Sequence, residues 1–126
     1  YQYPPGARTG VPDDAIRALI VAHSAEKGIV RRAFLADEIV TRVLVTMVNE
    51  IAALVEDGIA AHASDPDLVL VNGYGFPAHE GGPVFWASRQ SRDQLRTALD
   101  GLQSATGHGF RAGNVDHLID QWAREA

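Results

Sequence analysis

The chain has 126 residues, a formal net charge of −5 and no cysteine. This length allows one domain with a modest core, and it is short for an enzyme that carries its own cofactor fold. The acidic balance excludes the electrostatic footprint of a nucleic-acid-binding protein. The missing thiols exclude disulfides, cysteine nucleophiles and thiolate metal sites, and they favour a reducing intracellular compartment such as a bacterial-type cytoplasm.

The first twelve residues have the composition of an extended linker. They contain three of the six prolines and two of the twelve glycines of the chain, and this composition disfavours regular structure. The chain opens on Tyr1, with neither an initiator methionine nor a signal-peptide pattern. We therefore expect residues 1–12 to be a linker and the whole chain to be a piece of a longer protein.

A first helix is predicted from Asp13 to about Lys27. Pro12 favours a helix start, and Gly28 is the predicted stop. The residues that share one face of this helix are Ile16, Leu19, Ile20 and His23.

The most strongly patterned stretch runs from Asp37 to Gly58. Its apolar residues recur at steps of three and four and so gather on one face of a helix; they are Val40, Val43, Leu44, Met47, Val48, Ile51, Leu54 and Val55. The pattern places on the opposite side Glu38, Arg42, Thr46, Asn49, Ala53 and Asp57. Asp37 is the predicted N-cap and Gly58 the predicted stop, while Glu38 and Arg42 have the spacing of a stabilising ion pair. Because Arg42 interrupts the longest apolar run, no membrane span is predicted.

An ambiguous glycine pattern follows this helix. Residues 68–71 are strand-like, and the stretch from Gly73 to Ala78 matches the outline G-x-G-x-x-A of a dinucleotide-binding turn. In that motif a helix begins at the glycines and directs its amides at the pyrophosphate, whereas here Pro77 and Gly81-Gly82-Pro83 break such a helix. We therefore favour a tight loop that needs glycine dihedral angles, and we expect no cofactor-binding residue.

Helices are also predicted after Pro83. The apolar residues of this stretch indicate one helix, or two that are joined near Gln90-Ser91, with Gly101 as a weak point and Gly107 and Gly109 as the end; they are Phe85, Trp86, Leu95, Leu99 and Leu102. A last helix is expected after Asn114, its predicted cap. The buried side of that helix is predicted to hold Val115, Leu118, Ile119 and Trp122.

No residue pattern predicts a reaction centre. The histidines have no pair at the i,i+4 spacing of a helical metal site; they are His23, His62, His79, His108 and His117. His79-Glu80 lacks the second histidine of a zincin motif. His79 is the best acid–base candidate, although we favour its interpretation as an exposed loop residue. Arg42 and Glu50 lie two turns apart, so a solvated or interhelical ion pair is favoured over a catalytic pair. We predict no catalytic and no metal-binding residue.

Several short motifs follow one another in a specific order: Asp37-Glu38-Ile39, Arg42, Val48-Asn49-Glu50, Glu56-Asp57-Gly58-Ile59, Ser64-Asp65-Pro66-Asp67-Leu68, Gly73-Tyr74-Gly75-Phe76-Pro77 and Gly81-Gly82-Pro83. This order resembles the C-terminal domain of 3-hydroxyacyl-CoA dehydrogenase. It is most similar to the second copy of that domain in the multifunctional fatty-acid-oxidation enzymes that join enoyl-CoA hydratase to the dehydrogenase. The resemblance covers roughly residues 28–110.

The resemblance implies an all-α helical bundle, including a helix at residues 67–72. It implies that NAD and the histidine–glutamate catalytic pair belong to a separate domain of the parent enzyme, so that this chain holds no cofactor. In the first copy, an asparagine beside the arginine of the long helix positions the substrate. Here Thr41 stands before Arg42, and threonine lacks the donor and acceptor pair of an amide, so this copy is expected to be inactive. Ser88 departs from the aspartate that is usual in the family.

The resemblance therefore implies a non-catalytic packing or dimerisation module, residues 13–126, of an enzyme that oxidises (S)-3-hydroxyacyl-CoA to 3-ketoacyl-CoA with NAD. Its expected partners are the preceding dehydrogenase domains and, when it is isolated, a second copy of itself. The acyl-CoA substrate is expected to bind to the parent enzyme. The residues carried over as architectural are Arg42, Asn49, Glu50, Gly73, Gly75, Phe76, Pro77, Gly81, Gly82 and Pro83. The alternatives are a stand-alone protein-interaction or acyl-CoA-binding module and, on the glycine pattern alone, an NAD-dependent enzyme.

Overall fold

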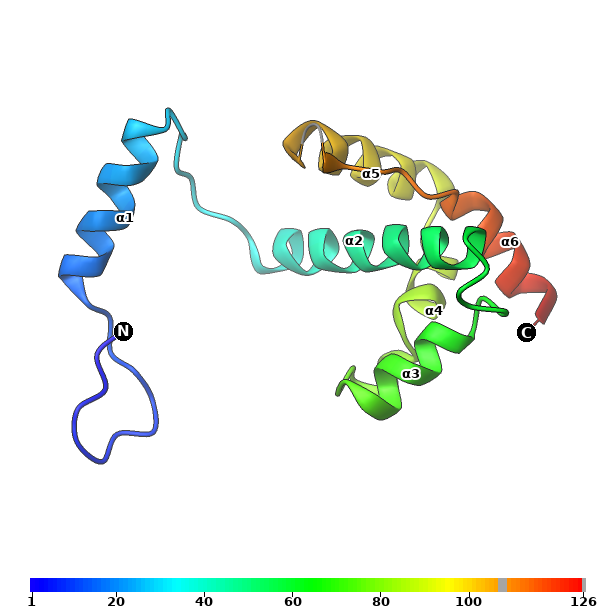
Figure 1. The fold of residues 1–126 in the computed structure, drawn as a ribbon, viewed down its shortest axis with the longest axis horizontal. Coiled ribbons are helices and arrows are strands. Elements are labelled where there is room, and N and C mark those ends of the chain that lie inside the picture. The colour runs from blue at the N-terminus through cyan, green and yellow to red at the C-terminus, as the bar shows by residue number, and fades with distance from the viewer. Residues whose placement is uncertain (107–108, 126) are drawn as a thin grey trace. The chain divides into compact units, whose positions relative to one another are not determined.

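The structure, a computed structural model, describes residues 1–106 and 109–125 and is all-helical (Figure 1). The helices are α1 (Asp14–Glu26), α2 (Ala36–Glu56), α3 (Asp65–Gly73), α4 (Pro83–Ser88), α5 (Arg92–Thr106) and α6 (Val115–Glu125), with a 3₁₀ turn η1 (Ala78–Glu80) before α4. The described residues form no strand and only one isolated bridge, between Gln2 and Val11. The predicted all-α fold is confirmed.

The chain divides into two compact units, residues 1–34 and residues 35–126. In the first unit the proline-rich segment bends back on itself, because Gln2 and Val11 exchange two backbone hydrogen bonds of 2.9 Å. The division falls after Phe34, whereas the sequence placed a linker at 1–12 and one domain at 13–126. That domain assignment stays a prediction.

The first helix, α1, has the expected ends. The Asp13 carboxylate accepts hydrogen bonds from the amides of Ala15 and Ile16, at 2.9 and 3.3 Å, and so caps the helix. Gly28 follows the helix with a φ of 66°, a conformation that favours glycine. The predicted helix is confirmed, and none of its residues is buried.

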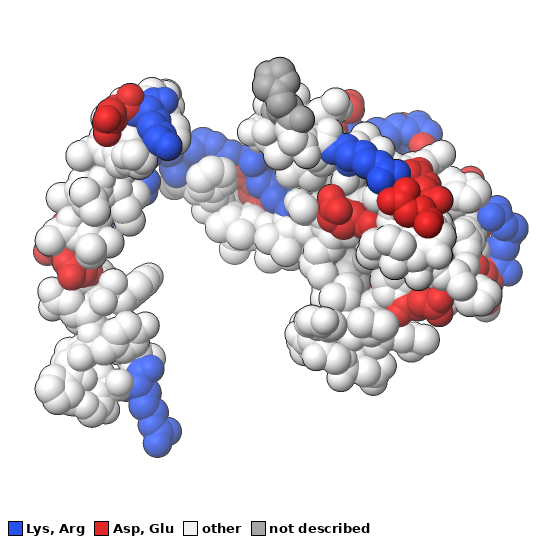
Figure 2. Space-filling view, viewed as in Figure 1, with Lys and Arg blue, Asp and Glu red and all other residues white. Residues whose placement is uncertain are grey.

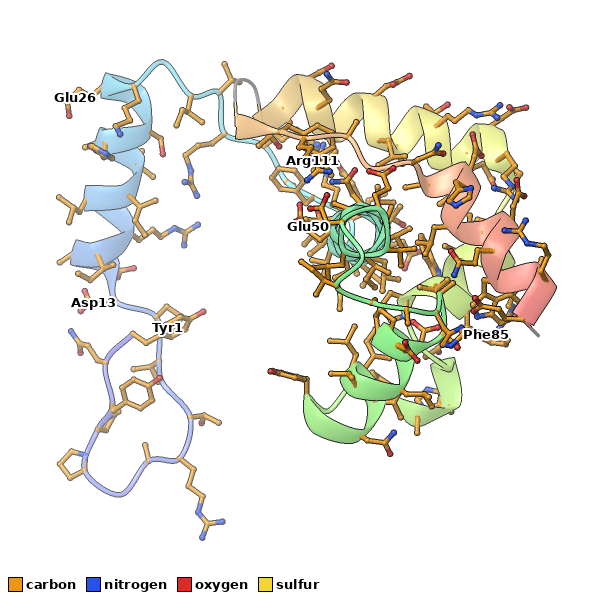
Figure 3. All side chains as sticks on the ribbon, turned by 45° about the vertical axis from the view of Figure 1, so that its right-hand side comes forward. Tyr1, Asp13, Glu26, Glu50, Phe85 and Arg111 are labelled. Atoms are coloured by element: carbon orange, nitrogen blue, oxygen red, sulfur yellow. The ribbon has the colours of Figure 1, made fainter. Side chains whose placement is uncertain are left out.

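In the second unit, α2 is the central helix and packs against α4, α5 and α6. Figure 3 looks nearly along α2 and shows α5 and α6 beside it. Phe85 of α4 meets Trp122 of α6, with ring centroids 5.9 Å apart. The buried apolar residues are Val45, Val48, Ile51, Ala52, Ala63, Val84, Ala87, Leu95, Val115, Leu118 and Ile119.

The predicted apolar stripe of α2 is only partly its buried face. Val48 and Ile51 are buried as predicted, whereas Val40 and Val43 are each 54 % exposed. Asn49, predicted on the polar side, is fully buried. Helical periodicity groups side chains by angle, and the neighbouring helices decide which angle is covered.

The two ends of α2 differ in how well they were predicted. The N-cap is Leu35, without a side-chain hydrogen bond, and Asp37 lies in the first turn of the helix, so the prediction of Asp37 as the cap is wrong. Its carboxylate there complements the positive end of the helix dipole. At the other end Gly58 has a φ of 70°, and the amide of Ile59 donates to the carbonyl of Leu54 at 2.9 Å. This is the predicted glycine stop.

Residues 68–71, strand-like in sequence, belong to α3. Pro66 stands in the first turn of this helix, between two acidic residues, Asp65 and Asp67. Proline and acidic side chains both favour the N-terminus of a helix, and this local signal prevails over the β-propensity of valine and leucine. The strand expected from the residues alone is wrong, and the helix implied by the resemblance is confirmed.

The segment after Pro83 forms two helices joined near Gln90-Ser91, one of the two predicted arrangements. Ser91 and Gln94 cap α5 reciprocally: the Gln94 amide donates to the Ser91 hydroxyl at 3.2 Å, and the Ser91 amide donates to Oε1 of Gln94 at 3.3 Å. Asn114 caps α6, since its Oδ1 accepts from the amide of His117 at 3.0 Å. Gly101 lies inside α5, and Gly107 falls outside the described residues.

Candidate functional site

A buried carboxylate organises the loop between α3 and α4. Asp67 is 5 % exposed, and its two oxygens accept hydrogen bonds of 2.8 Å from the amides of Val84 and Phe85. These amides are free donors of the first turn of α4, so Asp67 caps that helix from another element. Burial raises the pKa of Asp67 above its ordinary value, and the two amide hydrogen bonds oppose this effect without cancelling it.

The Gly81-Gly82-Pro83 motif is required by this cap. Gly82 has a φ of 117°, and a Cβ atom there would lie 2.3 Å from Cγ of Asp67. Gly81 has a φ of 74°, and a Cβ atom there would meet the ring of Phe85 at 2.6 Å. Pro83 is buried in the first turn of α4, where its missing N–H costs nothing.

The stretch Gly73-Tyr74-Gly75-Phe76-Pro77 turns the chain away from α3. Gly75 has a φ of 74°, and the amides of Tyr74 and Phe76 both donate to the carbonyl of Leu70, at 3.2 and 3.0 Å. Phe76 is partly buried, whereas Gly73 and Pro77 are exposed. A helix precedes this stretch where a dinucleotide-binding turn has a strand.

Asn49 fixes the connection between α5 and α6. Its Nδ2 donates to the carbonyl of Arg111 at 2.9 Å, and its Oδ1 accepts from the amide of Gly113 at 2.9 Å. A Cβ atom on Gly113 would lie 2.6 Å from the carbonyl oxygen of Asn49. The Arg111 side chain in turn holds both oxygens of Asp57, at 2.8 and 2.9 Å. Figure 3 shows Arg111 beside α2.

Arg42 and Glu50 are not brought together. Arg42 pairs with Glu38 one turn away, at 3.3 Å, as its spacing predicted. Glu50 is exposed and lines a groove on another part of α2. The two residues therefore belong to different surroundings, and the structure describes no shared site for them.

The described histidines are dispersed. His62 lies 3.4 Å from Glu125 and His79 lies 3.4 Å from Glu80, both on the surface, and His108 falls outside the described residues. Within residues 1–106 and 109–125, no group of three or more His, Asp or Glu side chains could hold a metal ion. No helix in the described part of the chain is both long enough and apolar enough to cross a membrane.

Two open grooves lie along α2 in the second unit, and we call them together the apolar trough. The first has a volume of about 680 Å³ and lies between α2 and the loop before α4; its apolar lining includes Val40, Val43, Met47, Leu70, Phe76 and Trp86. The second has a volume of about 500 Å³ and lies between α2 and α3; its apolar lining includes Met47, Ile51, Leu54, Ile59, Val69 and Leu70. In Figure 2 the surface over α3 is mostly white, the colour of uncharged residues.

The architectural residues named from the sequence thus do not form one site. Arg42 pairs with Glu38, and Glu50 lines the trough. Gly73, Gly75, Phe76, Pro77, Gly81, Gly82 and Pro83 shape the loop and one wall of the trough, whereas Asn49 holds the α5–α6 connection. Sequence analysis missed Asp67 and Gly113 as key residues. Asp67 had a usable signal, because it lies in the quoted motif Ser64-Asp65-Pro66-Asp67-Leu68, but its partners Val84 and Phe85 are far along the chain.

No protein-family model matches the chain. The chain is 35 % identical over 96 residues to a Danio rerio protein named peroxisomal bifunctional enzyme, a match that covers 76 % of this chain and 13 % of that protein. Over 104 residues it is 36 % identical to the Homo sapiens protein and 34 % identical to the Cavia porcellus protein of the same name, covering 82 % of this chain and 14 % of each of them. The chain therefore matches one segment of each of these proteins and spans about one seventh of their length.

Proposed function

We propose that this chain is the second copy of the C-terminal helical domain of a 3-hydroxyacyl-CoA dehydrogenase, within a multifunctional enzyme of fatty-acid β-oxidation. The observation that carries the proposal is the 36 % identity over 82 % of this chain to 14 % of a bifunctional enzyme, the proportions expected for one module of a long protein. The all-helical fold supports it. The parent would oxidise (S)-3-hydroxyacyl-CoA to 3-ketoacyl-CoA with NAD held on a preceding domain.

The module itself is proposed to be inactive. Thr41 occupies the position at which the catalytic copy is expected to carry an asparagine, and a threonine hydroxyl lacks the paired donor and acceptor of an amide. The adjacent Arg42 forms an ion pair with Glu38 of the same helix. These residues support a structural role for α2 in this copy.

The proposed role is to pack against the preceding dehydrogenase domains through an apolar surface and so brace the substrate cleft. The trough supports this role, because Val40, Val43 and Val69 are more than half exposed at 54, 54 and 56 %, and exposed apolar patches mark interaction sites. We also propose that the isolated chain self-associates. For this chain we propose a reducing intracellular compartment. The cytoplasm is one candidate, and the peroxisome is another because the relatives are named for it.

The test compares the chain with the longer protein that contains it. We expect the longer protein to oxidise a 3-hydroxyacyl-CoA with NAD, and the 126-residue chain alone to show neither turnover nor NAD binding by calorimetry. Deletion of residues 35–126 from the longer protein should lower its thermal stability. Addition of the 126-residue chain as a separate molecule should restore part of that stability. Turnover or micromolar NAD binding by the chain alone would refute the proposal.

A second candidate function is a stand-alone module that binds proteins or acyl-CoA. The 680 Å³ groove favours it, because apolar clefts of this size hold small ligands. Titration of an acyl-CoA and of the matching free fatty acid into the chain separates the two functions. Saturable binding of acyl-CoA would support the ligand-binding module, and its absence would support the packing module.

A further inference from the structure

We infer that the apolar trough is a docking surface for a single amphipathic helix whose polar flanks carry lysine or arginine. The inference rests on the proposed function, in which this module packs against a neighbouring domain. It adds which surface is used and the chemistry of the segment that covers it.

The shape of the trough fits a helix. Its two grooves both have Met47 and Leu70 in their linings and so lie next to each other along α2. Along α2 the lining extends from Ile39 to Leu54, and at about 1.5 Å per residue this distance is about 22 Å. A partner helix of about 15 residues, roughly four turns, spans that length.

The floor of the trough provides the apolar contact that such a helix needs. Val43 on the α2 wall and Val69 on the α3 wall are 54 and 56 % exposed, and Leu54 near one end is 38 % exposed. An amphipathic helix places its apolar residues at i, i+3, i+4 and i+7, a stripe that buries such a floor along its whole length.

The charges around the trough select the partner. The acidic residues that line it are Glu50, Asp65 and Glu80. No lysine or arginine lines either groove among the described residues. Asp65 is held in place because its carboxylate accepts from the amide of His62 at 3.0 Å, and Glu80 lies 3.4 Å from His79. Carboxylates in both grooves attract a helix with basic flanks and repel one with acidic flanks.

The same charges argue against two other occupants. A second copy that docked by the same face would bring these three carboxylates against three more, and the phosphates of a CoA ester would also meet acidic groups. Added salt screens such repulsion, so it would strengthen binding of either of these occupants. Binding of a basic helix depends on attraction, and added salt would weaken it.

The test uses the whole chain and labelled helical peptides of about 18 residues, long enough to cover the trough. One peptide carries a leucine stripe with lysine and arginine flanks, a second the same stripe with glutamate flanks, and a third the basic composition in scrambled order. Fluorescence anisotropy should show micromolar binding of the first peptide, at least tenfold weaker binding of the other two, and weakening when salt rises from about 50 to about 300 mM.

Matched variants locate the site. Glu50→Lys should weaken binding of the basic peptide about three- to tenfold, whereas Asp100→Lys, the same charge change on the exposed face of α5, should leave it unchanged. Val69→Asp should weaken binding at least tenfold, whereas Val21→Asp on α1 should not; both valines are exposed, at 56 and 48 %. Circular dichroism confirms that each variant is folded.

Equal binding of the basic and acidic peptides would overturn the inference, and so would equal effects of Glu50→Lys and Asp100→Lys. Self-association that strengthens with salt and excludes the basic peptide would assign the trough to a second copy instead. These failures leave the proposed function standing if truncation still destabilises the longer protein. Turnover by the chain alone refutes the proposed function whatever the peptides do.

Discussion

The two sides of α2 present different surfaces to the solvent. On one side α5 and α6 cover the helix and carry a network of ion pairs on their outer surface: Arg92 reaches Asp116 at 3.1 Å and Asp120 at 2.6 Å, and Arg96 reaches Asp116 at 2.9 Å. On the other side α3 packs on α4, and the apolar trough stays open.

This difference shows which surface needs no binding partner. A face whose charges pair with one another suits water and needs no partner, although exposed pairs add little stability. A face of half-exposed valines lined by acidic residues, with no lysine or arginine among its described lining residues, leaves apolar area exposed and suits a basic partner. The contrast, more than the apolar content of α2 alone, points to the trough as the surface that binds.

The largest expected effect comes from the core that both sides share. Leu118 of α6 is 1 % exposed, and Leu118→Ala should lower the free energy of unfolding by about 2–5 kcal/mol through lost contacts and a cavity. Urea denaturation measures this loss. Leu68→Ala, at an exposed leucine (60 %) on α3, is the control and should change stability by less than about 0.5 kcal/mol. Equal effects would mean that α6 does not carry the core.

The next effect concerns the polar anchor of the covered side. Asn49→Ala should cost about 2 kcal/mol, because it leaves the Gly113 amide and the Arg111 carbonyl without their partner. Asn72→Ala is the matched control, since Asn72 is exposed and donates only to the Leu68 carbonyl of its own helix, at 2.8 Å. Thermal unfolding of both variants checks the difference, and a harmless Asn49→Ala would contradict it.

The two sides should respond to acid in opposite directions. The pKa of Asp67 is raised, chiefly by burial, so its contribution to stability is greatest at low pH and is lost as the pH rises through the raised pKa. The pKa of Asp116 is lowered, chiefly by the hydrogen bond from Arg96, so its contribution is present at neutral pH and is lost as the pH falls through the lowered pKa.

Asp67→Asn and Asp116→Asn separate these contributions. Asp67→Asn should cost about 1–2 kcal/mol at neutral pH, because an amide nitrogen cannot accept the second backbone hydrogen bond, and the cost should grow as the pH falls. The cost of Asp116→Asn should shrink over the same range. Urea denaturation at several pH values between about 7 and about 4 measures both trends; parallel trends would contradict this assignment of the two pKa shifts.

A smaller effect is expected on the ion-paired side. Arg92→Gln should lower stability by at most about 1 kcal/mol, because the pairs it breaks are partly exposed. It should leave sedimentation of the isolated chain unchanged. A change in its association state would mean that α5 and α6 also take part in an interface.

The smallest effect on stability, and the sharpest contrast, is expected from Val43→Asp. This valine is 54 % exposed, so the free energy of unfolding should change by less than about 0.5 kcal/mol. Binding of the basic helical peptide, measured by fluorescence anisotropy, should nevertheless fall at least tenfold, because the substitution places a charge on the apolar floor of the trough. Unchanged peptide binding would move the docking surface elsewhere.

A feature was predicted correctly when the residues that determine it lie close together in the sequence. The cap of α6, Asn114, and the stop of α2, Gly58, act within one turn of their own helix, and both were predicted. Asp13 was predicted as the first residue of its helix, and the structure makes it the cap. Asp37 failed as a cap because α2 begins one residue before it. Asp67 was missed because it caps a helix 17 residues away, a partnership that local spacing does not reveal.

Sequence alone determined that this chain is helical, where most of its helices end, and which loops need glycine, because these features depend on backbone dihedral angles and neighbouring side chains. Only the tertiary structure decided that Asn49 is buried while Val43 is exposed. Both residues satisfy the periodicity of α2, and burial depends on which helices pack against each side of it. The trough exists because α3 packs mainly on α4, an arrangement that no local pattern specifies.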